Sequence, residues 1–133
     1  MQAGFGVMVS NMFGDNGAEH FNKAIGKTIK ALAITNNALR IDFDDGYAIA
    51  LRDEGQSCCE TRYINTDDDL PYYVGAKLVS GEVAPAPSPE HEWGVHQVSF
   101  LRITTDRGVF TVQTHNEHNG YYGGFAIVVR LAN

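Results

Sequence analysis

Strict alternation of apolar and polar side chains over residues 39–52, "LRIDFDDGYAIALR", is the feature that most constrains the fold. Two alternating runs joined by a short polar turn predict a β-hairpin with one buried face. A three-residue loop over 44–46 places Phe43 opposite Tyr47 and keeps every apolar side chain on that face, whereas a two-residue turn would divide them. We expect Gly46 to take the left-handed bulge position that such a loop needs.

Further strands are predicted on both sides of this hairpin. Residues 28–35 have the pattern of a preceding strand, with a helix as the alternative, and residues 96–116 predict a second hairpin. A loop of two or four residues places Leu101, Ile103, Phe110 and Val112 on one face of that hairpin and Phe100, Arg102, Gln113 and His115 on the other. The sequence "TDRG" at 105–108 favours the four-residue loop. The run at 125–132 is almost wholly apolar up to Arg130, which predicts a strand in the middle of a sheet with both faces covered.

Two short helices and one loop complete the prediction. Residues 16–26 predict a helix that Gly26 ends and that must dock through Ala18, Phe21 and Ile25, because a short helix is unstable alone.

Residues 66–78 predict a second helix, which begins after an aspartate, has Pro71 in its first turn and ends at Gly75. Three prolines within 81–94 predict an extended surface loop. The expected fold is therefore α+β: a mostly antiparallel β-sheet built of hairpins, with one or two short helices. Residues 1–22 are expected to form an N-terminal arm or the start of a helix, and residues 23–133 a single domain.

Composition limits the classes of function. The chain has 133 residues and a formal net charge of −6, which argues against non-specific binding to double-stranded nucleic acid or to an anionic membrane. No apolar run is long enough to span a membrane, and the only two cysteines, Cys58 and Cys59, are adjacent and so poorly placed to bridge each other. A cytoplasmic location is the expectation that follows.

The segment "THNEHNGYYGGF" at 114–125 is the strongest candidate for a site. Amide and imidazole side chains can read the polar edge of a base or sugar, tyrosines offer flat faces for stacking, and glycines let the backbone come close. Two other chemical interpretations remain open: a zinc site, although the H-x-x-H spacing lacks the known helical pattern, and a catalytic histidine oriented by Glu117. A purely structural connection would use the same asparagines and glycines in turns.

Two further clusters have simpler interpretations. In "CCETRY", 58–63, the cysteines are expected to be small buried residues rather than nucleophiles, whereas Arg62 is either an ion-pair partner or a fork for a phosphate. Three consecutive carboxylates at 67–69 are expected to cap a helix and to carry solvated charge rather than to bind a cation.

These motifs, with "TDDDLPYYVGAKL" between them, resemble an uncharacterised family of small phage and prophage proteins over about residues 28–130. The resemblance implies a phage setting and a bacterial host, either infected or lysogenic, and it implies no activity.

The function we expect is non-enzymatic binding of a small nucleotide-like ligand, such as a cyclic nucleotide or an ADP-ribose derivative. The protein would sequester an immune signal as an anti-defence sponge, as a homo-oligomer and without cofactor or metal. The expected ligand-binding residues are Arg62, Arg102, His115, Asn116, His118, Asn119, Tyr121 and Tyr122. One alternative is a metal- or histidine-dependent nucleotide hydrolase that uses His115, His118 and Asp68, and another is a protein-binding inhibitor of a host factor.

Overall fold

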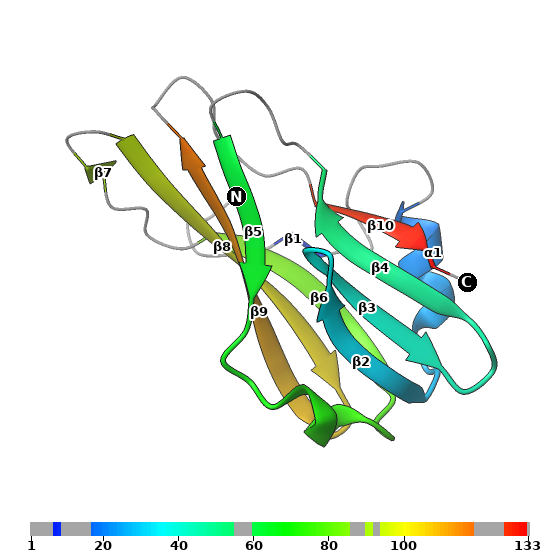
Figure 1. Ribbon diagram of the computed structural model, residues 1–133. Coiled ribbons are helices and arrows are strands. Elements are labelled where there is room, and N and C mark those ends of the chain that lie inside the picture. The colour runs from blue at the N-terminus through cyan, green and yellow to red at the C-terminus, as the bar shows by residue number, and fades with distance from the viewer. Residues whose placement is uncertain are drawn as a thin grey trace.

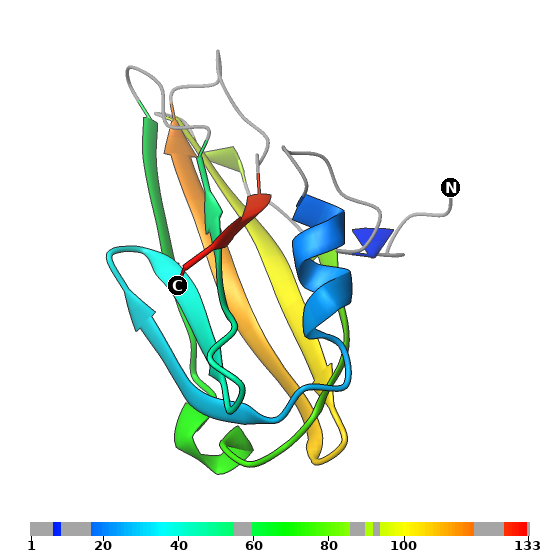
Figure 2. The same cartoon turned by 90° about the vertical axis from the view of Figure 1, so that its right-hand side faces the viewer.

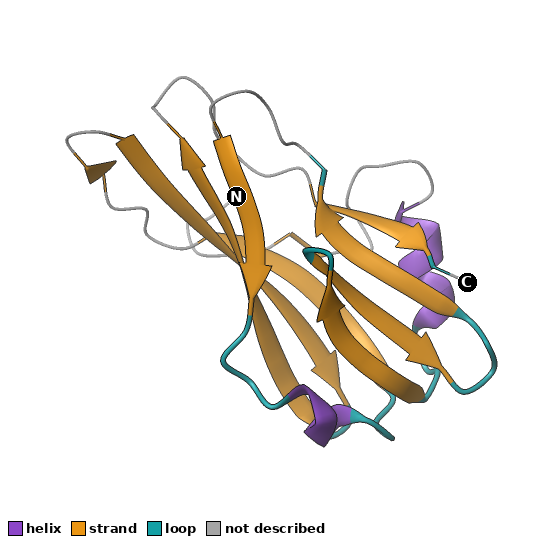
Figure 3. Ribbon diagram, in the orientation of Figure 1, coloured by secondary structure: helices purple, strands orange, loops and turns teal. Residues whose placement is uncertain are grey.

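The computed structural model consists of two antiparallel β-sheets that face each other, with one short helix at their side (Figures 1 and 3). It describes residues 7–8, 17–54, 60–85, 90–91, 94–118 and 127–132. The expected fold class is confirmed in its coarse form, because most of the described chain lies in hairpin-connected antiparallel strands.

The larger sheet has six strands, in the order β1-β6-β8-β9-β5, with β7 paired to β8 beyond the end of β6. Its strands are β1 (Val7–Met8), β5 (Glu60–Asn65), β6 (Leu78–Pro85), β7 (Glu90–His91), β8 (Gly94–Thr105) and β9 (Gly108–His118). The long β8–β9 hairpin forms its centre and corresponds to the predicted second hairpin.

The smaller sheet has four strands in the order β10-β4-β3-β2. Its strands are β2 (Ile29–Thr35), β3 (Ala38–Phe43), β4 (Ala48–Asp53) and β10 (Ile127–Leu131). The β3–β4 hairpin has the predicted register, with Leu39 opposite Leu51 and Ile41 opposite Ile49. The Phe43 amide donates to the Tyr47 carbonyl at 2.8 Å, and Gly46 has a φ of 90°, which confirms the three-residue loop.

The helix α1 (Gly17–Ala24) lies beside β10 and β4 and closes one side of the space between the sheets (Figures 1 and 2). Phe21 and Ala24 are fully buried, and the Tyr47 hydroxyl donates to the His20 carbonyl at 2.9 Å. Gly26, with a φ of 90°, ends the helix as predicted, but Ile25 lies beyond the last turn and is exposed rather than docked. The helix spans the boundary that the sequence suggested at residues 22 and 23.

One continuous apolar core fills the space between the sheets. It draws on α1, both hairpins and the end of β5, and its largest fully buried side chains include Phe21, Phe43 and Phe110. The polar side chains buried on the inner face of the larger sheet are Ser99, Thr105, Thr114 and Asn116.

Two predictions about strands are wrong. The strand β10 is at the edge of its sheet, because it pairs only with β4 among the described strands. Ile127 and Val129 face the core, whereas Leu131 is exposed. The apolar run therefore forms one buried face beside α1 and does not have two covered faces. Residues 81–85, predicted as loop, complete β6, because that strand pairs with β8 as far as Pro85.

Two predictions about turns are also corrected. The β8–β9 register is as expected, but Thr105 pairs with Gly108, so the loop has two residues, Asp106 and Arg107, rather than four. The predicted helix in 66–78 is one 3-10 turn, η2 (Leu70–Tyr73), followed by Gly75 with a φ of 97°.

Among the described residues, no helix is both long enough and apolar enough to cross a membrane.

Candidate functional site on the larger sheet

The two motifs that the sequence singled out lie on neighbouring strands. β5 carries the end of "CCETRY" and β9 carries the start of "THNEHNGYYGGF", and the two strands pair from Glu60 opposite His118 to Asn65 opposite Gln113. β5 is the edge strand of the larger sheet and β9 is its inner neighbour, and the chain enters β5 at the end where it leaves β9 (Figure 1).

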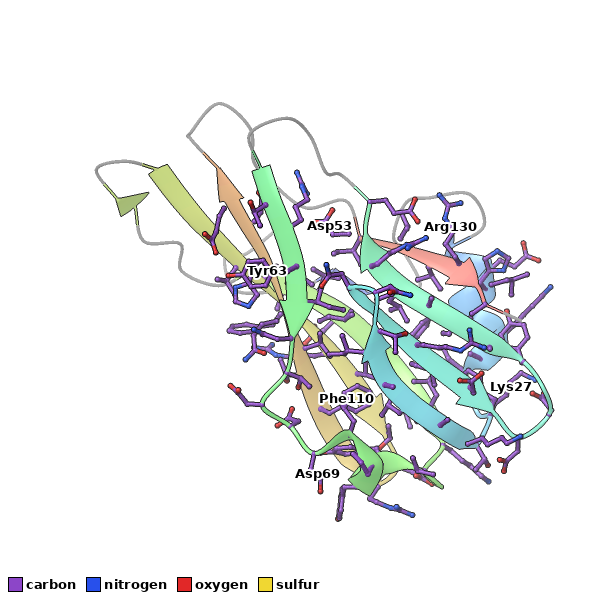
Figure 4. The ribbon with its side chains drawn as sticks, viewed as in Figure 1. Lys27, Asp53, Tyr63, Asp69, Phe110 and Arg130 are labelled. Atoms are coloured by element: carbon purple, nitrogen blue, oxygen red, sulfur yellow. The ribbon has the colours of Figure 1, made fainter. Side chains whose placement is uncertain are left out.

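Strand alternation then divides these motif residues between two faces. Arg62, Ile64, Thr114 and Asn116 point inward to the smaller sheet, whereas Tyr63 and its neighbours of the same parity point outward. In Figure 4 Tyr63 lies on the far side of the larger sheet from the core, and Phe110 lies between the sheets. Residues adjacent in the motif therefore cannot all meet one ligand.

The outward side chains of β5 and β9 form a connected polar and aromatic cluster. The Tyr63 and His115 rings are stacked, with centroids 4.4 Å apart and planes within 8°. The Tyr63 hydroxyl donates to Glu117 Oε2 at 2.6 Å. His115 Nε2 lies 3.0 Å from Asn65 Oδ1, and because an amide oxygen only accepts, this bond requires the proton on Nε2.

These contacts favour the neutral phenol. The hydrogen bond to Glu117 raises the pKa of Tyr63, and burial and the charge of the same carboxylate raise it further. The bond to an ionised acceptor is of the stronger kind, so it holds the Tyr63 ring, and with it the stacked imidazole, in one orientation. The cluster presents fixed, half-exposed ring surface beside an exposed carboxylate and an exposed amide.

The same face continues onto β8. Phe100 lies opposite Gln113, which in turn lies opposite Asn65, and Arg102 is two residues further along β8. The Arg102 guanidinium carbon is 5.8 Å from the Phe100 ring centroid, and its Nη1 is 3.3 Å from Glu82 Oε1. Gln113 Oε1 is buried and accepts no hydrogen bond from the described residues. We call this set the outer-face patch: Tyr63, Asn65, Phe100, Arg102, Gln113, His115 and Glu117.

The inner face of the same strands is occupied differently. Arg62 Nη1 contacts both carboxylate oxygens of Asp53, at 2.9 and 2.7 Å, and only 7% of the Arg62 side chain is exposed. This pair links the start of β5 to the end of β4, and so joins the two sheets. Of the two alternatives that the sequence left for Arg62, the structure gives it the role of an ion-pair partner, with Asp53 as the counter-ion. Arg62 and Arg102 lie on opposite faces, so they cannot hold the same phosphate.

The predicted binding residues therefore separate into three groups. His115 and Arg102 lie on the outer-face patch, and Asn116 is fully buried on the inner face with Arg62. The other four lie outside the part of the chain whose side chains are described, and they remain predictions: His118, Asn119, Tyr121 and Tyr122. The same holds for Cys58 and Cys59.

Of the three aspartates after β5, one bonds the backbone of β9. Asp69 stands before η2 but makes no side-chain cap bond, which corrects the capping prediction. Asp68 Oδ2 instead accepts from the Thr111 amide at 2.6 Å. No three histidine, cysteine or acidic side chains among the described residues are grouped closely enough to hold a metal ion.

The sequence did not single out Tyr63, Asn65, Phe100 or Gln113 as site residues. The signal in β5 was the alternation of Thr61, Tyr63 and Asn65 with the apolar Ile64, which indicates a strand with one polar face. This alternation could not show that β9 is the partner strand, because local periodicity does not indicate which distant segments pair.

Comparisons with known proteins give a family but no activity. No curated protein and no solved structure matches the chain. One family model matches residues 22–128, which is most of the chain and spans every described strand of the candidate site. The chain belongs to the family described as a domain of unknown function, DUF7448.

Proposed function

We propose that the protein binds a small nucleotide-like ligand on the outer-face patch and holds it without chemical change. The observation that supports this most is the Tyr63–His115 stack with its two hydrogen-bonded neighbours, Asn65 and Glu117. A planar base can stack on half-exposed rings, and amide and carboxylate groups at their rim can read its polar edge. In the phage setting that the sequence resemblance implies, the protein would act as a sponge that removes a nucleotide immune signal.

The chemistry of the patch favours holding over turnover. The Tyr63 hydroxyl is neutral and committed to Glu117, and the elevated pKa of Tyr63 makes it a poor nucleophile at neutral pH. Serine and cysteine are absent from the patch, so a covalent intermediate on either residue is not part of the proposal.

The test is a binding measurement combined with mass spectrometry. The protein is titrated by calorimetry with a panel of cyclic nucleotides, mononucleotides and ADP-ribose, and each ligand is recovered and weighed. We expect at least one to bind and to return intact. Conversion of the ligand would make the protein a hydrolase, and binding of none, with capture of a stoichiometric protein, would favour the inhibitor alternative.

Matched variants locate the site. His115→Ala and Tyr63→Ala should each weaken binding about tenfold or more, since a stacked base contributes about 1–3 kcal/mol. Tyr72→Ala is the control, because Tyr72 is an exposed tyrosine that lies on η2, away from the patch, where its ring meets that of Tyr73 edge to face. Equal loss in the control and the site variants would place the ligand elsewhere.

A further inference from the structure

We infer that the ligand carries two bases joined through phosphate, so that it is a dinucleotide rather than a mononucleotide. This inference rests on the proposed function and names the ligand class of the same site. The outer-face patch has two separate positions for a stacked ring: the Tyr63–His115 pair and Phe100.

The spacing of these positions fits neighbouring bases. Val98 lies opposite His115, and Phe100 is two residues further along β8 on the same face. Two residues of strand span about 7 Å and neighbouring strands are about 4.8 Å apart, so the His115 and Phe100 backbones are separated by about 8 Å. Aromatic side chains on adjacent strands of an open sheet can hold successive bases in this way.

The polar groups between and beside the rings suit the same ligand. Gln113 stands opposite Phe100 and two residues from His115 on the same face, next to both ring positions, and its side chain is partly exposed. Arg102 lies against the Phe100 ring, where a phosphate attached to the second nucleotide would lie.

The existing partner of Arg102 does not prevent this role. Glu82 is 3.3 Å away and the Arg102 side chain is 42% exposed, and an exposed pair of this kind contributes little free energy. A phosphate can therefore replace the carboxylate.

Charge limits the length of the ligand. Arg102 is the only cation on the patch as defined, and the whole chain has a formal net charge of −6. A polynucleotide would gain no attraction beyond the first phosphate or two and would be repelled by the rest of the protein. A short ligand with two stacked bases uses all of the patch without that penalty.

The experiment compares ligand length on the full chain. Calorimetric titrations use adenosine and guanosine monophosphates and the 3′,5′-linked dinucleotides ApA and GpG. We expect a dinucleotide to bind at least about tenfold more tightly than the matching mononucleotide. In Phe100→Ala this advantage should disappear, and in His115→Ala the affinities for both lengths should fall.

A urea unfolding transition as cooperative as that of the wild type shows that the Phe100→Ala variant is folded. If the wild-type protein binds both lengths equally, or if Phe100→Ala keeps the dinucleotide advantage, the two-base inference is wrong and the proposed function survives. If no nucleotide of either length binds, the proposed function fails as well.

Discussion

At the scale of single residues, the alternation of side chains along β9 decides which face of the sheet each one occupies. His115 stacks on Tyr63 outside the sheet, and Asn116, the next residue, is fully buried inside it. The same division separates Tyr63 from Arg62 on β5. A motif that looks continuous in sequence is therefore two sets of residues with different roles.

The ionisation of Tyr63 tests the contacts that this residue makes in the outer-face patch. Because Glu117 accepts a hydrogen bond from the Tyr63 hydroxyl, the folded protein holds the pKa of Tyr63 above its ordinary value of about 10. Glu117→Gln should lower that pKa, since it removes the negative charge and the strong acceptor. Absorbance of phenolate against pH, measured for each protein and for its Tyr63→Phe counterpart, isolates this one tyrosine.

The sign of the linked stability change follows from that shift. A phenol whose pKa is raised on folding stabilises the protein below the unfolded value, and the contribution is lost as pH rises through the folded value. Wild-type protein should therefore lose stability in alkaline solution over a range that begins near pH 10, and Glu117→Gln should show a smaller loss. The same alkaline loss in both proteins would contradict the assigned hydrogen bond.

Two glycines with similar backbone angles offer a second residue-scale comparison. Gly46 has a φ of 90°, and a Cβ added there would meet no neighbouring atom within 4 Å. Gly75 has a φ of 97°, and a Cβ added there would lie 3.4 Å from Arg107 Nη2. Alanine at either site should cost about 1–2 kcal/mol through backbone strain.

Gly75→Ala should cost more than Gly46→Ala. The added Cβ would touch the Arg107 guanidinium, whose Nη1 donates to the carbonyls of Tyr72 and Val74 at 2.7 and 3.0 Å, so any shift of that group would weaken these two bonds. Urea unfolding of both variants measures the difference, and equal losses would mean that Arg107 adapts without cost.

At the scale of elements, side chains continue the pairing of β9 after β5 has ended. Asn65 is the last residue of β5, and beyond it the Thr66 hydroxyl donates to the Thr111 carbonyl while Asp68 Oδ2 accepts from the Thr111 amide. Two side chains thus satisfy the backbone groups that a longer β5 would have paired.

Adjacent aspartates provide the control for this interpretation. Asp68→Ala leaves the Thr111 amide without its acceptor and should lower the free energy of unfolding by about 1–2 kcal/mol. Asp67→Ala removes only a 3.4 Å contact with Gln113 and should change it by less than about 0.5 kcal/mol. Amide hydrogen exchange at Thr111 should quicken in the first variant alone, and faster exchange in both would contradict the assignment.

At the scale of the whole molecule, the two ends of the space between the sheets are held by different interactions. Toward η2 the interior is apolar and includes Phe110, Leu78 and Leu70. Where β4 ends and β5 begins, Arg62 and Asp53 join the sheets through a buried ion pair.

Removing one member of that pair should be costly. Arg62→Met leaves Asp53, whose side chain is 4% exposed, without the cation that compensates it, and the expected loss is about 3–5 kcal/mol. Arg52→Met is the matched control, because the Arg52 ion pair with Glu54 is half-exposed and should contribute less than about 1 kcal/mol. Urea unfolding compares them, and a small loss for Arg62→Met would show that the sheets do not depend on this link.

The sequence predicted local structure well and the assembly of that structure poorly. The β3–β4 register followed from the alternation and Gly46, because both are local. The sequence also placed Phe100, Arg102, Gln113 and His115 on one face of the β8–β9 hairpin, which the pairing confirms. The partner of Arg62 and the edge position of β10 depend on contacts between distant segments, which periodicity does not specify.

The alternation in β9 also affects how this family can diversify. Residues 111, 113, 115 and 117 can be exchanged while the core is left unchanged, because their side chains point away from it. A one-residue insertion before them would instead bring the neighbouring core residues outward and the patch inward, so indels in this strand should be selected against far more strongly than replacements at those four positions. Evolution could then alter the chemistry of the outer-face patch by substitution while the protein keeps the same fold.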